Sequence, residues 1–205
     1  MLRIYVISGM ITAIVLAAGY SRRMGRNKLL LTYKGRPLLA HVVECILAAK
    51  VGRVVIVTGF EADLVTSTVR GMDVQTVHNP DYEKGMTSTI QTGVAAADGE
   101  GYMICLSDMP YISPGEYKVL RNAFRQQYAH DKACIIQPSY DNQIGNPITF
   151  SAAWRQDILD NTDPEGCKNI IRRHQENVYR VEMLTPAILQ DIDWQDDYDR
   201  LSEGI

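Results

Sequence analysis

Positive charge is concentrated in one short segment near the start of this 205-residue chain. Three arginines and one lysine lie within residues 22–28, and they follow the small residues Ala17, Ala18 and Gly19. Small residues let the backbone approach a ligand and offer N–H groups to an anion. Arginine binds phosphate through two hydrogen bonds, and lysine supplies a mobile charge. The segment therefore predicts a triphosphate cradle rather than an ordinary basic loop, although it lacks the Walker A and GxGxxG patterns.

Two acidic segments supply oxygen ligands. Asp108 comes two residues after the apolar run 102–106, and Asp191 and Asp193 lie in a late stretch that reads as extended. Side chains at positions i and i+2 of an extended stretch point the same way, so both could reach one metal ion. Carboxylates are the ligands that Mg²⁺ prefers beside substrate phosphates. The alternatives are a turn aspartate at 108 and a solvated acidic turn near the C-terminus.

Two further loops carry polar groups. Residues 79–90 place several hydroxyl side chains before a predicted helix, where they cap the helix or leave N–H groups facing a ligand. Residues 145–150 read GNPITF, which indicates either a tight turn into a strand or a binding loop. The histidines show no spacing typical of a metal or catalytic set, and they are interpreted as structural or surface residues: His41, His78, His130 and His174.

Short β-branched runs alternate with longer helical patterns along the chain. Strands are predicted at residues 12–16, 53–57, 74–77, 102–106 and 133–137, and helices at residues 37–49, 62–69, 87–97 and 115–129. Pro37 and Pro114 fit the first turns of their helices, the latter after a capping Ser113. Alternating strands and helices predict βαβ units in a three-layer α/β/α, Rossmann-like fold with a mostly parallel sheet. Ligands of such sheets lie beyond the carboxyl ends of the strands, where the basic segment and Asp108 fall.

Composition bounds the class of protein. The apolar fraction of 46% and the charged fraction of 22% are those of an ordinary globular domain. A net charge of −3 argues against general binding to nucleic acid or to anionic membranes, and no apolar run reaches the length of a membrane span. Four dispersed cysteines fit a reduced, cytoplasmic setting. Residues 1–9 are predicted to be an N-terminal extension without function, and residues 10–205 a single domain.

The segment from Leu16 to Lys28 resembles the LAAGxSxRMGxxK signature of the MobA-like nucleotidyltransferases, in particular of their molybdenum-cofactor cytidylyltransferase branch. Further segments resemble motifs of that family in the same order: NPDYEKGMTST, LSDMP, GNPITF and DIDWQDDY. The family's GDxGAR motif has only a partial match at residues 163–168. Trp194 and Gln195 replace the family's Thr-Pro, and Thr89 replaces a common serine. The resemblance implies a sheet of the nucleotide-diphospho-sugar transferase type.

The resemblance also assigns roles to residues of this sequence. Catalysis falls to Arg23, Lys28, Asp108 and Asp193, of which Asp108 and Asp193 would hold Mg²⁺. The assigned acceptor-binding set is Gly145, Asn146, Pro147 and Lys168. The assigned nucleotide-binding set is Leu16, Ala17, Ala18, Gly19, Ser21, Arg23, Met24, Gly25, Lys28, Gly85, Met86, Ser88, Thr89 and Asp108.

The implied activity is Mg²⁺-dependent transfer of CMP from CTP to the terminal phosphate of molybdopterin or the molybdenum cofactor, with release of pyrophosphate. The choice of CTP follows from Ala18, because the related guanylyltransferases carry glycine there. A client molybdoenzyme of the xanthine dehydrogenase type, or its chaperone, is the implied partner. The alternatives are a nucleotidyltransferase that uses GTP or a sugar phosphate, and a non-catalytic molybdenum-cofactor chaperone.

Overall fold

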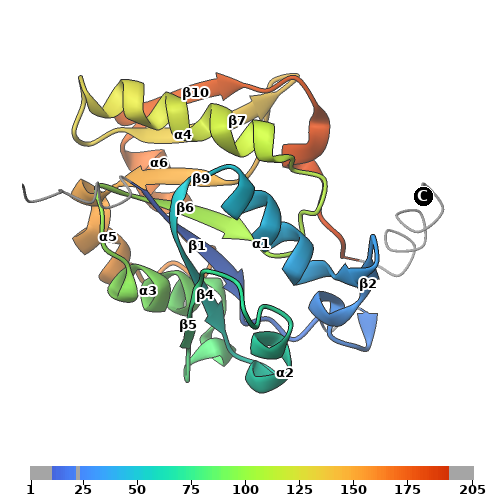
Figure 1. The fold of residues 1–205 in the computed structure, drawn as a ribbon. Helices are drawn as coiled ribbons and strands as arrows, with labels where there is room; N and C mark the ends of the chain where they lie inside the picture. Colours follow the sequence, from blue (N-terminus) through green and yellow to red (C-terminus); the bar gives the residue numbers. More distant parts are fainter. Residues whose placement is uncertain (1–10, 22–23, 194–205) are drawn as a thin grey trace, which may run out of the picture.

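A central sheet with helices on both faces forms the body of the protein, as the computed structural model in Figure 1 shows. The structure describes residues 11–21 and 24–193. The strands of the main sheet follow the order β10-β7-β9-β6-β1-β4-β5, with β8 paired to β7. Their bounds are Ile11–Ala17 (β1), Gly52–Thr58 (β4), Gln75–His78 (β5), Gly101–Leu106 (β6), Ile135–Tyr140 (β7), Gln143–Ile144 (β8), Ile148–Ser151 (β9) and Val178–Glu182 (β10).

The sheet is mostly parallel, as predicted. β1 lies between β4 and β6 and runs parallel to both, and β10 runs parallel to β7. β9 runs antiparallel to its neighbours β6 and β7. The five predicted strands are present, with ends that differ by up to three residues from the prediction. β8, β9 and β10 were not predicted, because none of them has a continuous apolar run.

The four predicted helices are present: α1 (Leu38–Ala48), α2 (Ala62–Ser67), α3 (Met86–Ala96) and α4 (Pro114–Tyr128). Ser113 caps α4 through a reciprocal pair of hydrogen bonds with Glu116, and Pro114 occupies the first turn. The prediction that Pro37 lies in the first turn of its helix was wrong. Pro37 precedes the first turn of α1, in an extended conformation. Two short helices, α5 (Arg155–Leu159) and α6 (Lys168–Arg173), were not predicted.

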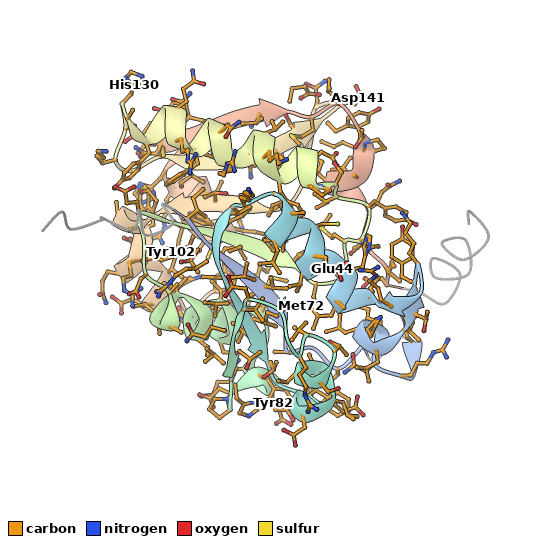
Figure 2. All side chains as sticks on the ribbon, viewed as in Figure 1. Glu44, Met72, Tyr82, Tyr102, His130 and Asp141 are labelled. Atoms are coloured by element: carbon orange, nitrogen blue, oxygen red, sulfur yellow. The ribbon has the colours of Figure 1, made fainter. Side chains whose placement is uncertain are left out.

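Each face of the sheet has its own hydrophobic core, and Figure 2 shows side chains filling the space on both sides. Consecutive residues of β1 face opposite cores, with Val15 in one and Ile14 in the other. Buried residues of α1 and α4 pack on the first face, and those of α3, α5 and α6 pack on the second. This arrangement confirms the predicted three-layer α/β/α fold.

A small hairpin stands beside the main sheet. β2 (Thr32–Tyr33) and β3 (Arg36–Pro37) pair antiparallel around Lys34 and Gly35, whose positive φ angles of 48° and 78° suit a tight hairpin turn. Tyr33 of this hairpin packs in a separate small cluster with Leu38 and Ile192. Ile192, near the last residue that the structure describes, thereby lies close to Met24 in the loop that follows β1.

No helix within residues 11–21 and 24–193 combines the length and the apolar character that crossing a membrane requires.

Candidate active site

An open pocket with a volume of about 480 Å³ lies beyond the carboxyl ends of β1 and β6. The loop after β1, the segment around η2 (Lys28–Leu30), the residues that precede α3 and the end of β6 form its walls. The lining residues are Leu16, Ala18, Gly19, Tyr20, Ser21, Lys28, Leu29, Tyr82, Glu83, Gly85, Met86, Thr89, Leu106, Ser107, Asp108 and Asp193. The pocket therefore lies where parallel α/β sheets bind their ligands.

The structure brings most of the predicted nucleotide-binding residues to this pocket: Leu16, Ala18, Gly19, Ser21, Lys28, Gly85, Met86, Thr89 and Asp108. The side chain of Ala17 packs in the core instead, and Met24 packs against the small cluster beside the hairpin. Gly25 is exposed with a positive φ of 65°, which suits a turn. Arg23 lies outside the described residues.

Ser88 lies in the first turn of α3, outside the lining of the pocket, and is held by the loop that precedes the helix. Its hydroxyl donates to the carbonyl oxygens of Asp81 and Gly85, both at 2.9 Å. The amide of Asn79 donates to the hydroxyls of Ser88 and Thr89, at 3.1 and 3.2 Å. These hydrogen bonds tie the loop that leads into α3 to the first turn of the helix. No side chain caps α3 at Gly85, so they are not the capping considered for this segment.

Lys28 lies among negative charges at one end of the pocket. Asn27 positions it by capping η2, where its side chain accepts a hydrogen bond from Leu29 N. The Lys28 Nζ lies 2.6 Å from Asp108 Oδ2 and 2.9 Å from Asp193 Oδ1. Burial alone would lower the pKa of Lys28, but the two carboxylates outweigh it and the net pKa is raised. Lys28 is therefore a firmly protonated, partly buried cation.

Three carboxylates form a compact acidic group. Asp108, Asp191 and Asp193 each offer one oxygen, and these oxygens lie within 4.8 Å of one another. Within the described part of the chain, Asp108 Oδ1 is buried without a hydrogen-bond partner. Burial and the charges of Asp108 and Asp193 raise the pKa of Asp191. The spacing of Asp191 and Asp193 predicted that both could reach a metal, but the predicted metal site held only Asp108 and Asp193. The structure places Asp191 in the acidic group as well.

An aromatic group that the sequence analysis did not single out forms another wall. The Tyr20 hydroxyl donates to Glu83 Oε1 at 2.5 Å, and the Tyr20 ring lies 4.9 Å from Phe60 and 5.3 Å from Tyr82. The hydrogen bond to Glu83 raises the pKa of Tyr20 well above its usual value. Gly59 permits this packing, because a Cβ there would lie 2.5 Å from Tyr82 Cβ. A signal for this group was present in the sequence, because Tyr20 lies within the segment Leu16–Lys28 and Tyr82 within NPDYEKGMTST. Both segments were already assigned to the nucleotide site.

The predicted acceptor-binding residues lie outside the lining of the pocket. Gly145 and Pro147 are buried, and the Asn146–Pro147 peptide bond is cis. The backbone N–H of Asn146 donates to the carbonyl of Ile188 at 3.0 Å. Lys168 is exposed and pairs with Glu165 at 3.4 Å. Their proposed role in binding the acceptor stays a prediction.

The partial GDxGAR match lies against the start of α3. Thr87 donates to the carbonyl of Asp163 and accepts from Gly166 N at 3.1 Å. A Cβ at Gly166 would lie 3.2 Å from the sulfur of Met86, which lines the pocket. The histidines, all of which are described, lie outside the lining of this pocket, and His41 Nε2 instead donates to the Pro110 carbonyl at 3.2 Å.

A pocket with a protonated lysine and clustered carboxylates, at the carboxyl edge of a mostly parallel sheet, is typical of nucleotide-binding transferases. The model of the MobA-like NTP transferase domain matches residues 13–178. The protein is therefore a member of the MobA-like NTP transferase family and an enzyme of the nucleotidyltransferase class. Residues 191–193, which carry two of the carboxylates, lie beyond the matched segment.

Relatives of similar size carry different names. The chain is 25% identical to the molybdenum cofactor cytidylyltransferase of Escherichia coli, over 92% of this chain and 93% of that one. It is 26% identical to the nicotine blue oxidoreductase of Paenarthrobacter nicotinovorans, over 89% and 92%. A nucleotidyl transferase structure from Methanothermobacter superposes with a TM-score of 0.82 at 27% identity, over 95% of this chain and 97% of that one. Family membership thus gives the class of reaction, whereas the differing names of the relatives leave the substrate open.

Proposed function

We propose that the protein transfers CMP from CTP to the terminal phosphate of molybdopterin or the molybdenum cofactor, giving the cytosine dinucleotide and pyrophosphate. The observation that carries the proposal is the contact of Lys28 with Asp108 and Asp193, which together with Asp191 form the acidic group beside the pocket. Similarity across 92% of the chain to a relative named for this transfer supports the choice of substrates.

The proposed reaction is an in-line displacement. An oxygen of the acceptor phosphate forms a bond to the α-phosphorus of CTP. The bond from the α-phosphorus to the oxygen that bridges to the β-phosphorus breaks, and that oxygen leaves with the electron pair as pyrophosphate. No side chain needs to act as nucleophile, so the protein contributes position and charge. Lys28 would donate hydrogen bonds to the triphosphate and offset its charge, as its raised pKa keeps it protonated.

The acidic group fits a divalent cation. Its donors are the hard oxygens that Mg²⁺ prefers, and the buried Asp108 Oδ1 is left unpaired within the described residues. Asp108 and Asp193 would hold the ion, with Asp191 as a third donor. When bound, Mg²⁺ supplies positive charge beside the reacting phosphates.

The base and the acceptor are the finer part of the proposal. Ala18 lines the pocket and is 4% exposed, so its methyl group could contribute to the choice of base. GTP, or a sugar phosphate as acceptor, would use the same lysine and carboxylates. A non-catalytic chaperone would not need them. We also propose a client molybdoenzyme, or its chaperone, as the recipient of the product.

The test is pyrophosphate release by the purified protein with Mg²⁺ and molybdenum cofactor, with CTP, GTP, ATP and UTP offered in parallel. We expect cofactor-dependent release with CTP. Preference for GTP would contradict the inference from Ala18 and keep the class of reaction. No release with any nucleotide, from protein shown to be folded, would favour another acceptor or the chaperone.

Asp108→Asn is the matched variant for this assay. It keeps the shape of the side chain and removes its charge, so we expect turnover to fall about 100-fold or more while the circular dichroism spectrum is unchanged. Asp157→Asn, on the exposed face of α5, should behave as wild type. Full activity of Asp108→Asn would remove Asp108 from the mechanism.

A further inference from the structure

The segment 188–193, which we term the acidic segment, reaches the site from a remote part of the fold. It begins at the end of η6 (Pro186–Leu189), where the carbonyl of Ile188 accepts a hydrogen bond from Asn146 N. At its other end, the backbone N–H of Ile192 donates to the carbonyl of Asp108 at 3.0 Å. Lys28 Nζ donates to the carbonyl of Ile192 at 2.7 Å. The segment is thus tied to three separate parts of the chain.

The carboxylates of this segment face an unfavourable environment. Asp191 and Asp193 lie within 4.8 Å of Asp108, oxygen to oxygen, so the three negative charges repel one another. Lys28 offsets part of this repulsion through its contacts with Asp108 and Asp193. The backbone hydrogen bonds described above fix the ends of the segment but bury no apolar surface. A further attractive interaction is needed to hold the carboxylates together.

Ile192 supplies that interaction. It is 0% exposed and packs with Tyr33 of the hairpin, Leu38 of α1 and the partly buried Met24. In extended chain, neighbouring side chains point to opposite sides. Burial of Ile192 therefore turns the side chains on either side of it, Asp191 and Asp193, away from the apolar cluster and toward Asp108.

We propose that Ile192 is a positioning residue of the metal site: its insertion between the hairpin and α1 holds Asp191 and Asp193 beside Asp108. The role toward a metal rests on the proposed function, whereas the anchoring of the acidic segment does not. Ile192 presents no ligand atom of its own side chain, so its effect passes through the two aspartates. The β2–β3 hairpin then provides part of the apolar cluster against which Ile192 of the acidic segment packs.

The first test is hydrogen exchange on metal-free protein, followed at the amide of Ile192. We expect Ile192→Ala and Ile192→Thr to speed exchange of this amide roughly tenfold or more, as local opening no longer exposes a buried apolar side chain. Ile192→Val should exchange nearly as wild type. Threonine and valine have the same shape, so this pair keeps the test valid if the alanine variant fails to fold.

The second test is Mn²⁺ titration of folded protein, with free Mn²⁺ measured by electron paramagnetic resonance. Loss of support for two ligands should weaken binding roughly tenfold in Ile192→Thr, within the range seen when groups that orient metal ligands are removed. Ile192→Val should retain affinity. Ile158→Ala, at a buried position in the opposite core, should lose stability without losing Mn²⁺ affinity.

The two tests separate the proposals. Exchange at Ile192 that is unchanged in folded Ile192→Thr would overturn the positioning role. Wild-type Mn²⁺ affinity in that variant would overturn it as well. If the wild-type protein binds no Mn²⁺, the metal site of the proposed function fails, and the exchange result alone decides whether Ile192 anchors the acidic segment.

Discussion

At the scale of single residues, Asp108 lies between Lys28 and the proposed cation site. Its Oδ2 contacts Lys28 at 2.6 Å, and its Oδ1 is buried and unpaired within the described residues. One carboxylate can therefore serve the lysine with one oxygen and a cation with the other. Asp193 also contacts Lys28, so the lysine competes with a cation for the negative charge of the group.

Replacing Lys28 by methionine should separate metal binding from turnover. Lys28→Met keeps a similar length and removes the charge, so Mn²⁺ should bind roughly tenfold more tightly, equivalent to about 1.4 kcal/mol. Turnover should fall, because the triphosphate loses a hydrogen-bond donor and a positive charge. Titration with Mn²⁺ and steady-state kinetics measure the two effects. Weaker Mn²⁺ binding together with lower turnover would contradict the competition between lysine and metal.

At the scale of elements, the position of α3 depends on Gly93. A Cβ at Gly93 would lie 2.3 Å from Ile14 Cγ2 of β1 and 3.0 Å from Val57 Cγ2 of β4. Glycine thus allows α3 to approach the sheet closely, which sets the residues at its start, Gly85 and Met86, at the wall of the pocket.

Two helix glycines provide a matched comparison of this close approach. Gly93→Ala should overpack the interface of α3 and destabilise the protein by about 1–3 kcal/mol. Gly115→Ala in α4 meets only Ser113 Oγ, at 3.5 Å, and should be stabilising by about 0.5–1 kcal/mol through helix propensity. Denaturant unfolding of both variants measures these changes. Equal effects of the two substitutions would contradict the role given to Gly93.

At the scale of the whole molecule, the site joins distant parts of the chain at one edge of the sheet. β1 and β6 are neighbours in the sheet, and this pairing places the basic loop beside Asp108. Asp193 lies 165 residues from Lys28 in sequence and reaches it only after the chain has passed through the remaining strands. Binding of a cation at this junction should therefore stabilise the global fold.

Thermal unfolding with and without divalent metal tests this linkage. At a Mn²⁺ concentration of 100 times Kd, stabilisation of about 2.7 kcal/mol corresponds to a rise in Tm of roughly 5–10 °C. Asp108→Asn should lose most of this rise, and the exposed Asp157→Asn should retain it. A metal-induced rise that survives in Asp108→Asn would place the cation elsewhere.

Much of the sheet and its helices could be predicted, because their signals are local. The runs that became β1, β4 and β6 are continuously apolar, and Ser113 with Pro114 marks the start of α4. β9 escaped prediction because four residues show little periodicity, and its antiparallel direction depends on its neighbours β6 and β7. The same reason applies to β8 and β10, whose pairing supplies most of their stability.

The chemistry of the loops that follow β1 and β6 could be inferred from the residues alone, since motif spacing there involves only nearby residues. Which of these groups meet depends on the folded chain. It brought Asp191 into the acidic group, joined Tyr20 to Glu83, and left Lys168 outside the pocket lining. These outcomes depend on packing between segments far apart in sequence. Burial of Ile192, which residue spacing does not reveal, is the clearest case.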